Sequence, residues 1–179
     1  MTIRRLFAND AQSFQALRLA ALLDTPQAFG SSHEEEKDLS LAVVAQRLDG
    51  HPGHAVFGKF DGDTLVGLVG VVREPLLKMA HKATVWGMYV TGAARGLGTA
   101  RELMHAALAH ARATPGVAKV TLDVDAANVA AIALYESLGF EVFSRESDAM
   151  RVDGRPRDDL RMHLRLTSEP AATPARPAT

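Results

Sequence analysis

A glycine-rich hexapeptide is the part of the sequence best suited to bind a charged ligand. It covers residues 95–100, follows a strand-like run that ends at Val90, and precedes a long run rich in Ala and Leu. The first amide groups of a helix have no partner inside the helix, and the helix dipole adds partial positive charge there. Glycine or alanine at positions 96, 98 and 100 lets a ligand approach the backbone. The hexapeptide therefore predicts a binding loop for a phosphorylated cofactor.

Three interpretations of this loop compete as long as it is read alone. A Walker loop requires Gly-x-x-x-x-Gly-Lys followed by Ser or Thr, a string that the chain lacks. A dinucleotide fingerprint requires Gly-x-Gly-x-x-Gly, but Arg101 stands where the third glycine belongs. The third interpretation is a tight turn from strand to helix that binds no ligand.

A second motif separates these interpretations. Residues 128–140 read Asn-Val-Ala-Ala-Ile-Ala-Leu-Tyr-Glu-Ser-Leu-Gly-Phe, which closely resembles the Asn-x-x-Ala-x-x-Leu-Tyr-x-x-x-Gly-Phe signature of the GNAT family of N-acetyltransferases. Arg95-x-x-Gly98-x-Ala100 is similar to the Arg/Gln-x-x-Gly-x-Gly/Ala loop of that family. The resemblance covers residues 3–166 in the order of elements and is sharp over residues 84–140. It implies a GNAT fold.

The resemblance implies that acetyl-CoA is the co-substrate. In that family the strand before the loop separates from its parallel neighbour, and its backbone pairs with the two amides of pantetheine as an added strand would. The loop amides bind the pyrophosphate. Arg101 could add a contact to a phosphate, or could be a solvated helix residue. The cofactor-binding residues implied for this chain are Met88, Tyr89, Val90, Arg95, Gly96, Leu97, Gly98, Thr99, Ala100, Arg101, Asn128 and Tyr135.

Two residues are candidates for proton transfer. Tyr135 matches the position where many family members place the acid that protonates the departing thiolate, and a phenol with a pKa of about 10 can do so. Several members carry a glutamate base where this chain has Thr84. Residues 122–128 and 133–140 are instead similar to ribosomal-protein N-terminal alanine acetyltransferases, which have a glutamate where Asp123 stands. Asp123 is therefore the first candidate base, with Glu74 and His81 as alternatives.

The hydrophobic pattern predicts one α/β domain over residues 1–166. The expected GNAT fold has a central mixed sheet, mostly antiparallel, with a splayed parallel pair and about four helices. Strands are expected over residues 3–6, 55–60, 65–72, 84–90, 117–124, 140–147 and 160–166. Helices are expected from an Asp10 cap to residue 25 and over 39–48, 98–113 and 128–138. Residues 167–179, rich in Pro, Ala and Thr, are expected to form a disordered tail.

The composition excludes several classes of function. The 179 residues include 20 basic and 21 acidic side chains, a balance that indicates neither a nucleic-acid partner nor a membrane partner. The absence of cysteine excludes disulfides, thiolate metal sites and a thiol nucleophile. The seven histidines have no metal-ligand spacing, so no metal is expected. Without an apolar run of about 18 residues, a cytoplasmic location is the default expectation.

The function expected from the resemblance is direct transfer of an acetyl group from acetyl-CoA to a primary amine of a small or amino-acid-like acceptor. Two alternatives remain open: a protein N-terminal acetyltransferase of the ribosomal-protein type, and a non-catalytic sensor that binds acyl-CoA. The acidic residues 34–36 fall where the family has its acceptor loop and could attract a cationic amine, or could be a solvated charge run. The resemblance is also compatible with a homodimer.

Overall fold

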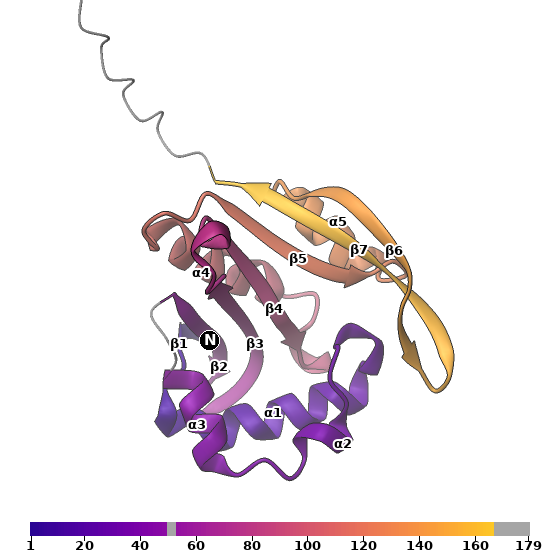
Figure 1. The fold of residues 1–179 in the computed structure, drawn as a ribbon. Coiled ribbons are helices and arrows are strands. Elements are labelled where there is room, and N and C mark those ends of the chain that lie inside the picture. Colours follow the sequence, from indigo (N-terminus) through magenta and orange to yellow (C-terminus); the bar gives the residue numbers. More distant parts are fainter. Residues whose placement is uncertain (50–52, 167–179) are drawn as a thin grey trace, which may run out of the picture.

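A seven-stranded sheet with helices on both faces forms the molecule (Figure 1). The computed structural model describes residues 1–49 and 53–166, so the tail predicted over residues 167–179 lies outside the described residues. The strands are β1 (Thr2–Arg5), β2 (His54–Asp61), β3 (Thr64–Arg73), β4 (Lys82–Val90), β5 (Lys119–Asp125), β6 (Glu141–Val152) and β7 (Arg155–Arg165). The helices are α1 (Ala11–Asp24), α2 (His33–Glu36), α3 (Leu41–Asp49), α4 (Thr99–Ala113) and α5 (Val129–Ser137). Short 3-10 turns are η1 (Ala8–Asp10), η2 (Pro26–Ala28), η3 (Leu77–Met79) and η4 (Gly92–Ala94).

The strand order is β1-β2-β3-β4-β5-β7-β6, and every neighbouring pair except β4 and β5 is antiparallel. The parallel pair is held over only three residues of each strand, 82–84 in β4 and 119–121 in β5. Beyond this point the two strands separate, so the edge of β4 that faces β5 has no strand partner from Val85 onward. These features confirm the predicted mixed sheet with a splayed parallel pair.

A bulge in β4 lies where the two strands have separated. Leu68 of β3 pairs with Tyr89 and Gly70 pairs with Trp86, so Gly87 and Met88 together oppose the single residue between them. Gly87 has φ +67°, in the left-handed region that side chains rarely adopt. Such a two-against-one arrangement bends the strand and turns side chains away from the regular alternation.

Two hydrophobic cores lie on opposite faces of the sheet. On one face, α4 and α5 pack on β3, β4 and β5, with Leu103, Met104 and Leu108 of α4 at most 2% exposed. On the other face, α1 and α3 cover β2 and β3 through residues such as Phe14, Leu22 and Val44. Because each strand buries side chains on both faces, the β-rich sequence runs alternate less clearly than half-exposed strands do.

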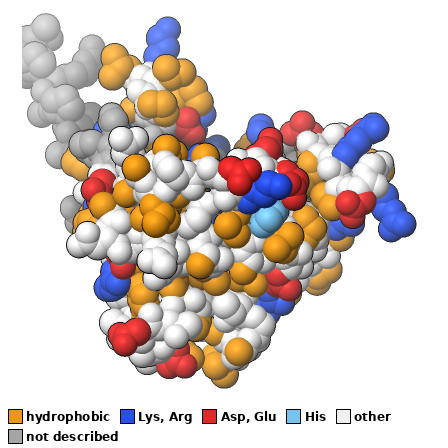
Figure 2. All heavy atoms as spheres, turned by 90° about the horizontal axis from the view of Figure 1, so that it is seen from below, with side chains coloured by type: hydrophobic (Ala, Val, Ile, Leu, Met, Phe, Trp, Pro, Cys, Tyr) orange, Lys and Arg blue, Asp and Glu red, His pale blue; other side chains and the backbone are white. Residues whose placement is uncertain are grey.

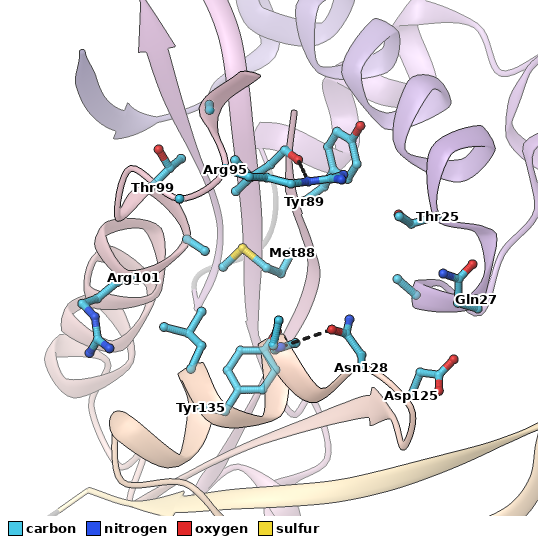
Figure 3. Close-up of a pocket in the computed structure, with 18 of the residues that line it drawn as sticks. Thr25, Gln27, Met88, Tyr89, Arg95, Thr99, Arg101, Asp125, Asn128 and Tyr135 are labelled. Atoms are coloured by element: carbon cyan, nitrogen blue, oxygen red, sulfur yellow. Dashed lines mark hydrogen bonds between the residues drawn. The ribbon is translucent and has the colours of Figure 1, made fainter. Parts of the chain in front are cut away.

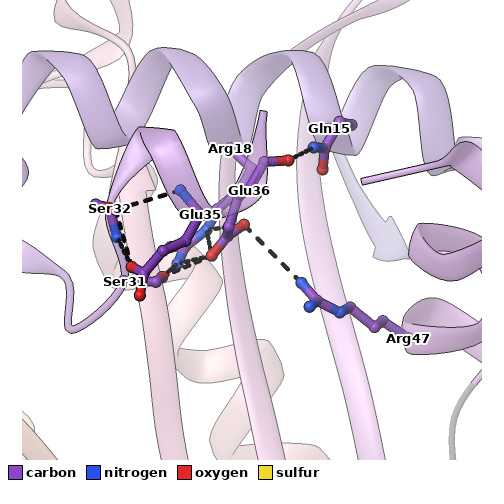
Figure 4. Close-up of polar contacts among 7 residues, drawn as sticks. All are labelled: Gln15, Arg18, Ser31, Ser32, Glu35, Glu36 and Arg47. Carbon is purple, nitrogen blue, oxygen red and sulfur yellow. Dashed lines mark hydrogen bonds and ion pairs between the residues drawn. The ribbon is translucent and has the colours of Figure 1, made fainter. Parts of the chain in front are cut away.

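A buried ion pair joins α1 to α2 (Figure 4). The Arg18 guanidinium lies against the Glu36 carboxylate at 2.9 Å, and their side chains are 8% and 9% exposed. Ser31 also donates to Glu36, at 2.6 Å, while the Gln15 side chain donates to the Glu36 backbone carbonyl at 2.7 Å. Burial acts to raise the pKa of Glu36, but hydrogen bonds from Arg18 and Ser31 outweigh it and leave that pKa lowered.

The three glutamates at residues 34–36 each form a hydrogen bond or an ion pair with another residue of the protein. Glu35 forms a capping box with Ser32 at the start of α2, and Glu34 pairs with Lys37. Since Glu36 pairs with Arg18, this run does not form a free acidic surface for a cationic acceptor. The face that carries α1 to α3 mixes acidic, basic and apolar side chains (Figure 2). None of the helices in the described residues is long and apolar enough to cross a membrane.

Three sequence predictions differ from the structure. The closing strands are longer than 140–147 and 160–166, because β6 and β7 continue through charged residues to a turn at Asp153 and Gly154, both with positive φ. Residues 33–36 form the short helix α2 inside a stretch predicted to be only polar. Asp10 precedes α1 as predicted, but its carboxylate accepts hydrogen bonds from Arg4 and the Phe7 amide and does not cap the helix.

Replacing Glu36 with Gln tests the buried ion pair. We expect a loss of about 3 kcal/mol in the free energy of unfolding at pH 7, because Arg18 would keep a buried charge without its counter-ion. The folded-state pKa of Glu36 is lowered, so the carboxylate stabilises the fold above its ordinary pKa of 4.5. This contribution is lost as the pH falls through the lowered value. Urea unfolding at pH 7 and below pH 4 measures both effects.

The matched control is Glu34→Gln, because Glu34 lies two residues away and is exposed. Its unfolding midpoint should remain close to that of the wild type. An equal loss for both variants would contradict the role assigned to the Arg18–Glu36 pair.

Candidate active site

A cavity of about 610 Å³ occupies the space that opens between β4 and β5 (Figure 3). Its walls come from the end of β4, the loop before α4, the first turn of α4, the inner face of α5 and the η2 turn. The lining residues include Thr25, Gln27, Met88, Tyr89, Val90, Arg95, Gly96, Gly98, Thr99, Ala100, Arg101, Asp125, Asn128, Leu134, Tyr135 and Arg157. The cavity thus brings together the two sequence motifs and all of the predicted cofactor-binding residues except Leu97.

The loop before α4 presents a row of free amides to this cavity. Gly96 has φ +75° and Gly98 has φ +77°, conformations that glycine adopts without strain. The Glu102 amide is the first in α4 to bond back to the loop, to the Gly98 carbonyl at 3.1 Å. The amide groups of residues 96–101 make no backbone hydrogen bond within the described residues. Six amides without backbone partners at the positive end of α4 are suited to bind an anion.

The Arg95 side chain fixes the loop and points away from these amides (Figure 3). Its Nε donates to the Val90 carbonyl at 3.0 Å, and an Nη donates to Asp24 at 2.5 Å. The Tyr89 hydroxyl donates to the same Asp24 carboxylate at 3.0 Å, and that bond together with burial raises the pKa of Tyr89. The loop is therefore attached to the last residue of α1.

Helix α5 forms the apolar wall opposite β4. Asn128 caps this helix, because its side-chain oxygen accepts the Ala131 amide at 3.1 Å. Tyr135 lies further along the helix and is 6% exposed. Burial raises the pKa of Tyr135 to about 12, so the phenol keeps its proton at physiological pH. Tyr135 is therefore a neutral phenol in the cavity that can donate a proton, whereas the hydroxyl of the other phenol, Tyr89, already donates to Asp24.

The side chains of two residues predicted to bind the cofactor are oriented differently from this expectation. Leu97 is 59% exposed and does not line the cavity, because its side chain points to solvent between the two glycines. Arg101 lines the cavity, but its guanidinium donates to Ser137 at 2.8 Å and joins α4 to α5. The Leu97 amide has no backbone hydrogen-bond partner among the described residues.

A second cavity of about 290 Å³ continues from the first along the separated strands. Gln27, Ala28 and Asp125 line both cavities and mark where they meet. Its other walls are Trp86 and Gly87 of β4, Phe29 and Gly30 after η2, and Met150 on the long β6–β7 hairpin. Arg18 also lines it, with a buried Nη1 that has no partner among the described residues.

Asp123, the predicted base, lies in this second cavity and not beside Tyr135 in the first. Its carboxylate accepts a hydrogen bond from Arg161 at 3.1 Å, and its side chain is 51% exposed. The alternatives lie elsewhere. Glu74 lines neither cavity and accepts from the Thr84 hydroxyl at 2.9 Å, and His81 is exposed at the other end of β4.

Several residues of the cavities were missed from the sequence. Asp125 is 5% exposed and accepts hydrogen bonds from the Ala127 amide at 2.7 Å and from Arg157 at 2.8 Å. Its signal was present in the sequence, because residues 123 and 125 lie on the same face of one strand. Arg157 and Asp159 carry no recognisable local motif, whereas Gln27 belongs to the segment that the resemblance places at the acceptor loop.

The glycine at the start of α4 provides a test of the loop. We expect Gly98→Val to weaken binding of acetyl-CoA, the predicted cofactor, at least tenfold, since valine disfavours φ +77° and shifts the free amides. Calorimetric titration measures the affinity. Gly92→Ala is the matched control, because Gly92 lies in the same connection without positive φ and with open space around it. Equal affinity of the two variants would contradict this role of the loop.

Comparison with known proteins gives one consistent family. The model of the acetyltransferase (GNAT) family matches residues 16–140. A mycothiol acetyltransferase from Corynebacterium glutamicum is 37% identical over 101 residues, which are 55% of this chain and 32% of that protein. The chain therefore spans about a third of the length of this relative.

Solved structures agree with this result over nearly the whole chain. A ribosomal-protein-alanine N-acetyltransferase from Brucella melitensis has a TM-score of 0.81 and 26% identity, and the match covers 93% of this chain and 100% of the other. A protein from Salmonella typhimurium, solved with its cofactor acetyl-CoA, has a TM-score of 0.81 and 24% identity, with 98% and 99% covered. The family predicted from the two motifs is confirmed: the chain belongs to the acetyltransferase (GNAT) family.

Proposed function

We propose that this protein transfers the acetyl group of acetyl-CoA to a primary amine of a small or amino-acid-like acceptor by direct attack. The observation that carries the proposal is the row of free amides at residues 96–101, located at the end of a cleft opened by β4 and β5. An anion site, a strand edge without a partner and a buried phenol occur in one cavity, and these three groups match the parts of acetyl-CoA.

Each part of the cofactor has residues that fit it. The pyrophosphate fits the amides of the loop and of the first turn of α4. The pantetheine amides fit the open edge of β4 at Met88, Tyr89 and Val90, where an extended ligand can bond as an added strand. Asn128, Ala131 and Leu134 of α5 would cover the other side of the arm. The thioester then lies toward the β4 bulge, where the two cavities meet.

Tyr135 is the proposed general acid. When the C–S bond breaks, the sulfur leaves as a thiolate and needs a proton. A phenol with a pKa of about 12 is fully protonated near neutral pH, so it can donate its proton to the thiolate. Burial disfavours the phenolate that would result, and therefore favours its rapid reprotonation.

The second cavity supports a small acceptor. It is about half the size of the first and is bounded on several sides by the segment after η2, by β4 and by the β6–β7 hairpin. Only a small molecule, or the extreme end of a longer chain, fits such a space. Its aspartates favour an amine that carries positive charge before it reacts.

A protein N-terminal acetyltransferase is the second candidate function. The overall similarity to the ribosomal-protein-alanine enzyme from Brucella melitensis supports it, since the match covers almost all of both chains. The cytoplasmic location and the homodimer stay predictions from the sequence.

Replacing Tyr135 with Phe separates an enzyme from a sensor. We expect acetyl-CoA affinity within twofold of the wild type and turnover reduced at least tenfold, because only the hydroxyl that protonates the thiolate is lost. Calorimetry measures binding and thiol release measures turnover. Unchanged turnover would contradict the role of Tyr135. Binding of acetyl-CoA without turnover by the wild type would instead favour a sensor.

An amine panel tests the acceptor class. We expect faster acetyl-CoA consumption with amino acids or other small amines than with peptides that carry ribosomal-protein N-termini, because the second cavity is small. The panel includes polyamines and aminoglycosides, with free CoA release as the readout. Exclusive acetylation of the peptides would support the second candidate function instead.

A further inference from the structure

Three aspartates line the second cavity, which is called the acceptor cavity from here on because it is the proposed site of the amine. They differ in their contacts. Asp123 is paired with Arg161, while Asp125 is held by Arg157 and by the Ala127 amide. Asp159 of β7 makes no hydrogen bond or ion pair within the described residues, and its Oδ1 is buried. It is thus the one carboxylate of this cavity, among the described residues, that is free to receive a proton from a ligand.

The register of the strands places Asp159 close to the junction of the two cavities. Asp159 is directly opposite Asp125 across β5 and β7, and Asp125 lines both cavities. Asp123 is opposite Arg161, two residues away from the Asp125–Asp159 pair on each strand and on the same face of the sheet. On its other side Asp159 is opposite Glu146 of β6. An acceptor amine that approaches the thioester at the junction would therefore meet Asp159.

We propose that the Asp159 carboxylate is the general base that takes the proton from the acceptor amine. This inference rests on the proposed function and replaces Asp123 in that role. Asp123 is bonded to Arg161, and Glu74 lies outside both cavities. Asp159 is a catalytic residue here, because it contacts the reacting nitrogen.

The surroundings of Asp159 suit it to this task. Burial raises its pKa, and the negative charges of Asp123, Asp125 and Glu146 raise it further, while Arg157 lowers it. A carboxylate with a raised pKa is a stronger base than an exposed aspartate, and an aspartate with a cationic partner would be a weaker one. The same charges attract the ammonium form of the acceptor before transfer.

The protons balance over the reaction. Asp159 takes one proton from the ammonium group and later releases it to solvent. The neutral nitrogen forms a bond to the thioester carbon, and the C–S bond breaks as the tetrahedral adduct collapses. Tyr135 protonates the sulfur. The second proton lost by the nitrogen restores the Tyr135 phenol through solvent, so the products are an amide, free CoA and one proton.

The decisive variant is Asp159→Asn, which keeps the shape of the side chain but cannot accept the proton. We expect kcat/KM to fall about 100-fold with the fastest amine of the panel, with acetyl-CoA affinity unchanged. In the wild type, kcat/KM should also fall on the acid side as the pH passes through the raised pKa of Asp159. This decrease should be absent in the variant, because asparagine does not ionise. Any pH dependence that comes from the amine itself should be the same in both proteins.

Stability separates this role from a structural one. An ionised carboxylate with a buried oxygen and no partner opposes folding, so Asp159→Asn should unfold at an equal or higher urea concentration at pH 7. Asp158→Asn is the matched control, because Asp158 is adjacent, bonds to Arg145 and to the Asp148 amide, and lines neither cavity. Its activity should match that of the wild type.

Each other outcome overturns the proposal. An active wild type with an equally active Asp159→Asn rejects the role of Asp159 alone. A greater loss in Asp123→Asn or Glu74→Gln than in Asp159→Asn assigns the base to that residue. A wild type that binds acetyl-CoA and acetylates no amine rejects the proposed function itself.

Discussion

The short parallel pairing of β4 and β5 is the constraint on which the rest of the structure depends. Only residues 82–84 and 119–121 hold the two strands together, with the Thr84 and Thr121 hydroxyls 3.2 Å apart at the point of separation. Each strand keeps its other neighbour, since β4 pairs with β3 and β5 pairs with β7. The sheet can therefore open at its middle without losing the partners that stabilise both halves. Both cavities lie in that opening.

Helix α1 connects the two ends of this opening. Its last residue, Asp24, receives Arg95 from the cofactor loop and Tyr89 from β4. Six residues earlier, Arg18 pairs with Glu36 and lines the second cavity, the proposed acceptor site. A Cβ at Gly87 would make only an ordinary contact with Arg18 Nη1, at 3.9 Å, so the glycine of the bulge is favoured by its positive φ. The donor loop and the acceptor wall are thus positioned by one helix.

The donor half of the site could be predicted from the sequence because its determinants are local. The glycines at 96 and 98, the Asn128 cap and the position of Tyr135 follow from spacing within single elements, and the structure places all of these residues at one cavity. The closing pair of strands was predicted, but its extension through residues 148–159 was missed because charged residues interrupt the alternation. The Asp153-Gly154 turn between β6 and β7 has the same Asp-Gly sequence as Asp61-Gly62, which joins β2 to β3 between two apolar runs.

The acceptor half depends on pairings that no local pattern encodes. Asp123, Asp125 and Asp159 are equivalent as residues, and only the register of β5 and β7 decides which of them meets an arginine. Arg161 pairs with Asp123 and Arg157 pairs with Asp125, which leaves Asp159, opposite Asp125, without an ion-pair partner among the described residues. In a purely structural sheet such a charge would be a net cost to folding. Its retention at the junction of the two cavities is explained if the missing counter-charge is the ammonium group of the substrate.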